Sequence, residues 1–385
     1  MVASWTHRQS DGSTEGLRIS FDHAGTSEPS FTRSYSNFNL EFQHQLNLSE
    51  SNGLVWGLGF RDSTSDSSGT FTASETQPHR NNQLYSDFLQ DEITLADGHV
   101  SFIFGSKFEH NAFTGVEIEP GARFLWTPDN HHTLWAAVSR AVTTPPNLNK
   151  DIVVNITFPG PNGVPALTRL LGDAPYGSES LLAYELGYRL QAMRRFSIDL
   201  ATFYNDYQHL TTYEPGIPFF ESAPAPAHLV LPTYFSNNMR GGTYGSEISS
   251  NWNLTSRWRL IPSYSLLEFR LQLEPGSNAT TSLAKSGQSP RHQFQVRSNL
   301  DISKRWQFDS AIYYVSALPT LAVSGYARVD ARLGYRLRKD LEISLAGQNL
   351  QGGKHVEFVN PEGPFTRAAI SRSVFVKLTW ESALR

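Results

Sequence analysis

Regular alternation of apolar and polar residues is the feature of this chain that most limits its fold. In YARVDARLGYRLR (Tyr326–Arg338), apolar side chains occupy the odd positions from 327 onward, and arginine, aspartate or glycine occupies the even ones. NFNLEFQHQL (Asn37–Leu46), RFSIDLATFY (Arg195–Tyr204) and HQFQVRSNL (His292–Leu300) alternate in the same way. Successive side chains of a strand point to opposite faces, so this repeat predicts strands with one apolar and one polar face.

The predicted strands are numerous and long. About sixteen can be placed, many of nine or more residues, whereas strands of soluble proteins are usually about 5–6 residues long. About ten residues tilted near 40° cover roughly 25 Å, the height of the apolar band of an outer-membrane barrel. Their approximate bounds are 16–23, 37–48, 54–62, 84–95, 100–111, 116–126, 133–142, 182–190, 196–207, 234–253, 258–270, 292–302, 306–315, 326–338, 341–350 and 372–380.

The connections alternate in length, which separates membrane barrels from most soluble sheets. Short turns have the sequences LSESNG, ADGH, TPDNHH, QAMRR, LTSR, SKR and LRKD. The connections between them are mostly long and cover 63–82, 143–180, 212–233, 273–291 and 351–370. Short turns at one end and long loops at the other are typical of an antiparallel transmembrane β-barrel. A soluble antiparallel sheet would also alternate, but it has no reason to separate its loops by length.

Composition excludes several other classes. The 385 residues carry a formal net charge of -4, which gives no case for nucleic-acid binding. No apolar run approaches the roughly 20 residues that a transmembrane helix needs. Cysteine is absent, which fits a protein outside the cytoplasm. The first residues, MVASWTHRQSDGSTEG, show no signal peptide, so we expect a mature, engineered or truncated form of an exported protein.

Several segments, taken in order, resemble one family, the TonB-dependent outer-membrane receptors. They cover most of residues 83–380. They are FLQDEITL, GSKFEHN, PGARFLWTPDNHHTLWAAVSRAVTTP, AYELGYRLQAMRRFSIDLATFYNDY, NNMRGGTYGSEISSNW, SPRHQFQVRSNL, GYARVDARLGYRL and LAGQNLQG. The resemblance implies a 22-stranded barrel around an N-terminal plug. Such a receptor imports a scarce nutrient, usually a ferric siderophore, cobalamin, haem or a glycan, with energy supplied through the TonB inner-membrane complex.

The chain departs from that family pattern in three respects. No plug or TonB-box segment precedes the strands, about six strands of the family barrel have no counterpart, and ESALR follows the last strand where the family usually ends on an aromatic residue. We therefore expect residues 1–385 to form a single β-barrel domain that lacks the N-terminal part of the receptor. Such a chain would not transport alone. The alternatives are a passive sixteen-stranded porin and a secreted soluble β binding module.

The resemblance also implies a location and partners. We expect the outer membrane of a Gram-negative bacterium, with membrane lipid around the barrel and a small nutrient ligand. Contact with the TonB complex would occur only through the missing plug, and folding would need the barrel-assembly machinery. No cofactor is expected.

No catalytic motif is present. Gly-x-x-x-x-Gly-Lys-[Ser/Thr], Gly-x-Ser-x-Gly and His-Glu-x-x-His are all missing, so we predict no enzyme activity. His131 and His132 form the only adjacent histidine pair and lie in a short turn, where a solvated turn is favoured over a metal site. We therefore assign no catalytic residue and no metal ligand.

Three groups of residues are the candidates for function. Charges on the polar faces are expected to line the lumen, where Glu185 and Glu247 match family positions and are interpreted as pairing with wall arginines. Aromatic residues and one histidine in the long loops are expected to contact ligand, although packing between loops is an alternative. Seven tryptophans beside short turns are expected to form a membrane-interface girdle. The predicted lumen charges are Arg328, Asp330, Arg332, Arg336, Glu185 and Glu247; the ligand contacts are Tyr207, His209, Tyr213, Phe219, Phe220, Tyr234 and Phe235; the girdle is Trp56, Trp126, Trp135, Trp252, Trp258, Trp306 and Trp380.

Overall fold

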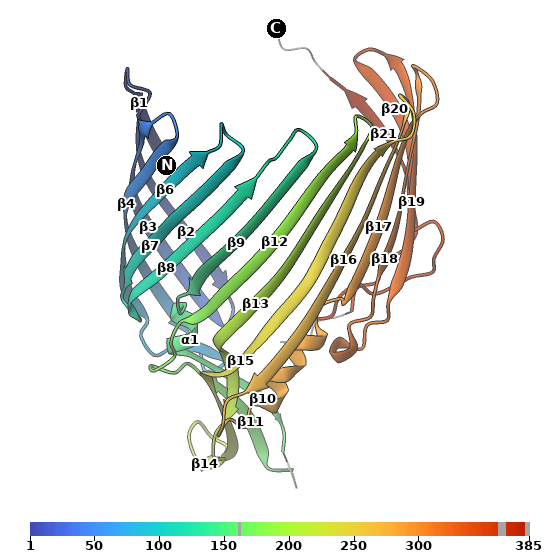
Figure 1. The fold of residues 1–385 in the computed structure, drawn as a ribbon. Coiled ribbons are helices and arrows are strands. Elements are labelled where there is room, and N and C mark those ends of the chain that lie inside the picture. Colours follow the sequence, from blue (N-terminus) through green and yellow to red (C-terminus); the bar gives the residue numbers. More distant parts are fainter. Residues whose placement is uncertain (161–162, 361–366, 382–385) are drawn as a thin grey trace.

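The structure is a computed structural model that describes residues 1–160, 163–360 and 367–381. These residues form one sheet of 21 strands, antiparallel throughout except where β11 pairs with β15 in parallel. Seventeen strands make up a curved wall (Figure 1). They are β1 (Val2–Arg8), β2 (Thr14–Glu28), β3 (Phe31–Ser49), β4 (Asn52–Gly69), β6 (His79–Leu95), β7 (Val100–Asn111), β8 (Gly115–Trp126), β9 (His132–Thr143), β12 (Glu179–Met193), β13 (Phe196–Pro215), β15 (His228–Asn253), β16 (Trp258–Leu273), β17 (His292–Asp301), β18 (Trp306–Val315), β19 (Tyr326–Arg338), β20 (Leu341–Gln348) and β21 (Ser373–Trp380).

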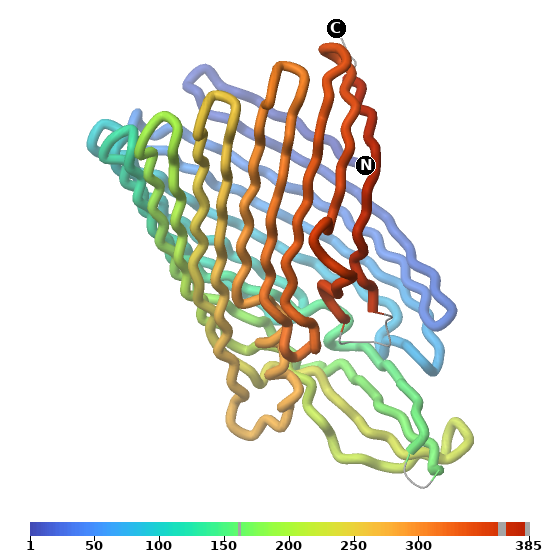
Figure 2. The backbone as a smooth tube through the Cα atoms, turned by 90° about the vertical axis from the view of Figure 1, so that its right-hand side faces the viewer, coloured from blue at the N-terminus to red at the C-terminus, as the bar shows by residue number. Residues whose placement is uncertain are grey.

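The all-β antiparallel barrel wall predicted from the alternation is confirmed. Each of the predicted strands overlaps one wall strand, and the one wall strand that was not predicted is β1. Its sequence VASWTHR has seven residues and a single large aromatic side chain, Trp5, so its alternation is too short to recognise. The wall curves round, but β1 pairs only with β2 and β21 only with β20 in the described residues (Figure 2).

Several strands extend beyond the segments that alternate. The expected serine-rich loop over 63–82 is wrong in part, because β4 continues to Gly69 and β6 begins at His79. Similarly, β2 and β3 are joined by only Pro29 and Ser30. Outside the apolar middle of the wall, the strands need no apolar face. Serine, threonine and aspartate can therefore occupy these strand ends, and their backbone groups still pair with the neighbouring strand. Composition alone therefore made these strand ends resemble loops.

The long connections fold into short elements of their own at one end of the wall (Figure 1). They contain α1 (Asn147–Asp151), β5 (Ala73–Glu75), β10 (Ile152–Pro159), β11 (Pro165–Leu171), β14 (Phe219–Glu221), η2 (Thr280–Gly287) and η3 (Pro319–Leu321). Pairing runs from β5 through β10 and β11 to the start of β15, which also pairs with β14. We call these five paired segments the loop sheet. The loops over 143–180 and 212–233 thus lie at the end opposite the short turns, as predicted.

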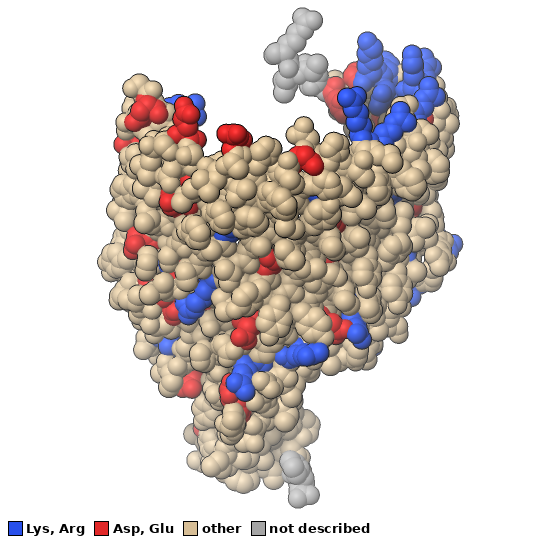
Figure 3. All heavy atoms as spheres, viewed as in Figure 1, with Lys and Arg blue, Asp and Glu red and all other residues tan. Residues whose placement is uncertain are grey.

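Cross-strand register shows that the wall has two chemically distinct faces. Residues directly opposite each other in a sheet point to the same side. One row across five strands consists of Leu200, Ile248, Tyr264, Phe294 and Tyr314, and the adjacent row on the other side consists of Asp199, Ser249, Ser263, Gln295 and Tyr313. The convex surface carries few charged side chains over the β13–β18 part of the wall, whereas acidic and basic side chains are scattered over its β4–β9 part and are frequent at the two ends (Figure 3).

Candidate functional site

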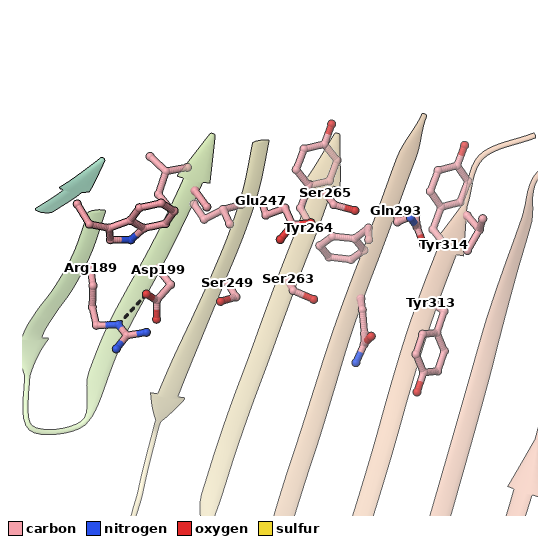
Figure 4. Close-up of a pocket in the computed structure, with 17 residues that line it drawn as sticks. Arg189, Asp199, Glu247, Ser249, Ser263, Tyr264, Ser265, Gln293, Tyr313 and Tyr314 are labelled. Atoms are coloured by element: carbon pink, nitrogen blue, oxygen red, sulfur yellow. Dashed lines mark hydrogen bonds and ion pairs between the residues drawn. The ribbon is translucent and has the colours of Figure 1, made fainter. Parts of the chain in front are cut away.

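The polar face of the wall contains a hollow of about 460 Å³, which we call the wall hollow (Figure 4). Arg189 and Asp199, directly opposite each other on β12 and β13, are joined by a bond from Nε to Oδ1 of 2.7 Å. Ser249, Ser263, Gln295 and Tyr313 continue the same row. Hydroxyl and amide groups both donate and accept hydrogen bonds, so this surface suits water or a polar ligand better than an apolar one.

Glu247 also lines the wall hollow, and its carboxylate has no ion pair within the described residues. The expected pairing of Glu185 with Arg189 is not present, because Arg189 pairs with Asp199 instead. Glu185 lines a neighbouring hollow of about 310 Å³ together with Arg123 and Glu92. The two predicted glutamates therefore lie on exposed parts of the polar face as uncompensated charges.

The charges on β19 form a brace with the strands beside it. Arg328 donates two hydrogen bonds to Asp330, at 2.9 and 2.7 Å, and the backbone N–H of Asn349 donates to the same carboxylate at 3.0 Å. Arg332 bonds to Asp309 on β18 at 2.9 Å and to Glu342 on β20. Arg336 is exposed farther along the strand. Most of these charged groups already pair with one another. The brace therefore joins neighbouring strands and leaves few free charges for a ligand.

The long-loop end has its own small apolar core. Ile152, Tyr176 and Phe235 are buried together, with the Tyr176 and Phe235 rings edge to face, and Tyr213 packs against them. Two of the predicted ligand contacts, Tyr213 and Phe235, are therefore packing residues in this structure. Packing between loops, the alternative to ligand contact, is what the structure shows for Tyr213 and Phe235.

The other predicted ligand contacts remain accessible to different degrees. Phe219 and Phe220 lie on β14, and their side chains are 40% and 71% exposed. Tyr234 is 38% exposed on β15, and Tyr207 is half-buried on β13. His209 is exposed in an irregularity of β13 between Tyr207 and Leu210, with a φ of 59° that non-glycine residues seldom adopt.

A polar network that no sequence pattern indicated holds the loop sheet to the wall. Asp151, which is buried, accepts hydrogen bonds from Arg80 on β6 and from Thr76. Arg169 donates to Asn155 at 2.8 Å and to Glu221 at 2.6 and 2.8 Å. These hydrogen bonds place the Arg169 guanidinium beside Glu221 and keep the pKa of that carboxyl below its usual value. The partners are too far apart in the chain for any local motif to reveal them.

The predicted girdle tryptophans do not all share one face. Following the register across the wall places Trp56, Trp126, Trp252, Trp258, Trp306 and Trp380 on the apolar face, near strand ends that adjoin short turns. Trp135 lies on the polar face instead, where it lines the hollow that contains Arg123 and Glu185. Its indole ring covers Gly187 on the neighbouring strand.

Neither a metal site nor a helical membrane span is found in the described part of the chain. No group of three histidine, cysteine, aspartate or glutamate side chains is close enough to hold a metal ion there. Over the same residues, no helix is both long and apolar enough to cross a membrane.

Comparison with known proteins agrees with the geometry of the wall. The sequence profile of the family described as "TonB dependent receptor-like, beta-barrel" matches residues 3–350. The chain therefore belongs to this family of outer-membrane receptor barrels, which are not enzymes. A search of curated protein sequences gave no significant match.

Solved structures of low sequence identity share the fold. The siderophore receptor PirA from Acinetobacter baumannii has a TM-score of 0.74 at 13% identity, and the match covers 98% of this chain and 62% of that one. A mutant of the ferric enterobactin receptor PfeA from Pseudomonas aeruginosa has a TM-score of 0.74 at 16% identity, with 98% and 61% covered. PirA from Pseudomonas aeruginosa has a TM-score of 0.71 at 14% identity, with 98% and 63% covered. The chain thus spans less than two thirds of the length of these receptors.

Proposed function

We propose that this chain forms part of the wall of an outer-membrane receptor that takes up a scarce nutrient in a Gram-negative bacterium. The observation that carries the proposal is the cross-strand register, which gives the wall a largely apolar convex face and a polar inner face that contains the wall hollow. Lipid suits the first face and an aqueous or plugged lumen the second. In this proposal residues 1–385 are one barrel domain, and Arg328, Asp330, Arg332, Arg336, Glu185 and Glu247 face its lumen.

A ferric siderophore is the ligand that we favour among the nutrients this family imports. Two of the similar structures are named as siderophore receptors and one as a ferric enterobactin receptor. Phe219 and Phe220 are exposed at the loop end and, as neighbours in β14, place one flat apolar ring on each side of the strand for an aromatic chelator. Cobalamin, haem and a glycan are the other ligands to be tested.

Transport would require more of the receptor than the wall described here. Both edge strands, β1 and β21, have unpaired outer sides in the described residues, and an unpaired edge inside a bilayer is costly. In this proposal further strands of the receptor pair with these edges in the membrane; in the porin alternative the two edges would pair with each other. In this proposal the chain binds and imports its ligand only together with a plug, through which energy from the TonB complex would reach the ligand.

Ligand binding by the full-length receptor in detergent tests the proposal. Intrinsic fluorescence should be quenched in a saturable manner by one ferric siderophore out of a panel that also contains cobalamin, haem and oligosaccharides. The double variant Phe219→Ala with Phe220→Ala removes whichever ring stacks on the ligand and should weaken binding by up to roughly tenfold, because such stacking contributes about 0.5–1.5 kcal/mol. Ile217→Ala is the matched control, because Ile217 is 87% exposed in the same loop but carries no ring.

Two outcomes would contradict this assignment. If no ligand of the panel binds and the protein shows steady ion conductance in planar bilayers, it is a passive porin. If the protein stays in solution without detergent, it is a soluble binding module.

A further inference from the structure

The short turns of the wall carry opposite charges on the two halves of the rim. Turns of the first half contain mainly acidic residues, although Arg8 borders the first of them, whereas turns from β12 onward contain mainly arginines and lysines, together with Asp340 (Figure 3). The acidic turn residues are Asp11, Glu50, Asp97 and Asp129. The basic ones, which we call the basic sector, are Arg194, Arg195, Arg257, Lys304, Arg305, Arg338 and Lys339.

The basic sector has almost no counterions of its own. All seven side chains belong to exposed residues. Only Arg338 forms an ion pair within the described residues, with Asp340 at 3.2 Å. The carboxylate of Asp301, beside the turn that holds Lys304, accepts a hydrogen bond from Gln307 at 3.1 Å. Seven exposed cations on one part of the rim, of which one is paired in the described part of the chain, form a region of positive charge that attracts anions from outside the chain.

Tryptophans place this sector at the boundary of a membrane. Arg257 is followed directly by Trp258, and Arg305 by Trp306; both indoles are on the apolar face and about 40% exposed. Trp380, which is 67% exposed, donates from its indole Nε1 to Asp340 in the β19–β20 turn at 3.2 Å. Indole rings prefer the depth at which acyl chains meet headgroups. The neighbouring cations then lie at the level of the lipid phosphates.

We propose that the basic sector binds the headgroups of anionic phospholipids, such as phosphatidylglycerol, in the leaflet that meets the short turns. The inference rests on the membrane location given under the proposed function. Guanidinium groups bind phosphate with two parallel hydrogen bonds, and lysines add point charges. The cations are spread over four successive short turns, and three of these turns lie beside an outward tryptophan. That arrangement fits a row of lipids along the rim better than one compact protein partner.

Energy transfer from tryptophan to labelled lipid tests this proposal on the full-length receptor in vesicles. Dansyl-phosphatidylglycerol and dansyl-phosphatidylcholine are compared at equal mole fraction. We expect a relative affinity for the anionic lipid roughly tenfold higher, because each cation near a surface contributes appreciably to anionic-lipid binding. High salt should remove the preference.

Two variants with equal numbers of substitutions on one rim provide the comparison. The first combines Lys304→Gln, Arg305→Gln, Arg338→Gln and Lys339→Gln and should lose most of the preference. The control combines Asp11→Asn, Glu50→Gln, Asp97→Asn and Asp129→Asn and should keep it. Insertion into vesicles and a heat-dependent gel shift show that each variant is folded.

The outcomes separate this inference from the proposed function. The inference alone is overturned if the inserted wild type transfers energy equally to both labelled lipids. It is also overturned if the variant with four neutralised cations keeps its preference for dansyl-phosphatidylglycerol. Saturable binding of polyglutamate together with equal transfer would assign the sector to an acidic protein and also overturn it. Failure of the wild type to insert would overturn both proposals.

Discussion

Arg169 on β11 and Glu221 on β14 form a two-point ion pair, with Nη1–Oε1 and Nη2–Oε2 distances of 2.6 and 2.8 Å. The two residues are 52 positions apart and belong to different long loops. The side chains are only 15% and 27% exposed, and His228 lies 3.4 Å from the same carboxylate. This contact joins the loop sheet into one unit at the end of the wall where ligand is proposed to enter.

Removing this pair should loosen the loops without unfolding the wall. Arg169→Gln leaves a partly buried carboxylate without its cation, which costs about 1–3 kcal/mol. We expect limited proteolysis within residues 212–233 to become roughly tenfold faster. Arg189→Gln is the control, because its pair with Asp199 is 64% and 45% exposed and contributes less than about 1 kcal/mol. Equal cleavage of wild type and Arg169→Gln would contradict the role of the pair.

The loop sheet should also weaken in acid. Hydrogen bonding from Arg169 lowers the pKa of Glu221 below its ordinary value. The pKa of a glutamate in an unfolded chain is about 4.3. When folding lowers that pKa, the ionised carboxylate stabilises the folded state at pH values above about 4.3, and this stabilisation is lost as the pH falls through the folded pKa. Hydrogen exchange at β14, corrected for its intrinsic pH dependence, should therefore be constant from neutral pH to about pH 5 and accelerate below that. In the variant Glu221→Gln, hydrogen exchange at β14 should not accelerate below about pH 5. If the acceleration is as large as in the wild type, another titrating group causes it.

The tryptophans should report the two faces of the wall separately. Trp306 is on the apolar face, whereas Trp135 is on the polar face beside Arg123 and Glu185. In vesicles of brominated lipid, we expect Trp306→Phe to lose part of the lipid-quenched fluorescence and Trp135→Phe to lose none of it. A loss of lipid quenching in Trp135→Phe would show that the face assignment is reversed there.

A methyl group at Gly187 should disturb the wall. A Cβ at this position would collide with the indole ring of Trp135, which lies across from it on β9. Trp135 is half-buried beside a hollow, and turning its ring away from its preferred conformation costs about 0.5–1.5 kcal/mol. The unfolding midpoint of Gly187→Ala in urea should fall accordingly. At Gly16 a Cβ would meet nothing within 4 Å, so Gly16→Ala should stay within about 0.5 kcal/mol of wild type. Equal midpoints for the two variants would refute the contact.

Sequence reasoning worked best where the membrane itself imposes a pattern. From Phe38 to Trp380, alternation located the wall strands, because each residue must suit either lipid or a polar interior. It failed for the outer parts of β2 to β6, where no apolar face is required. Among the predicted ligand contacts, Phe219 and Phe220 are exposed and stay candidates, whereas Tyr213 and Phe235 pack into a loop core with Tyr176. Aromatic character alone does not separate contact with ligand from contact with a neighbouring loop.

By itself, the sequence determined that this chain is a β-barrel wall, which of its residues share a face, and at which end the long loops lie. These properties depend on the alternation of apolar and polar residues and on the lengths of the loops. Both can be read from short stretches of the sequence. Only the tertiary structure decided which charges meet. Arg189 pairs with Asp199 rather than Glu185, and Arg169 on β11 reaches Glu221 on β14 across the start of β15, which pairs with both strands. Such pairs depend on strand order, register and loop folding, because contacts between residues distant in the chain exist only after the backbone has brought them together.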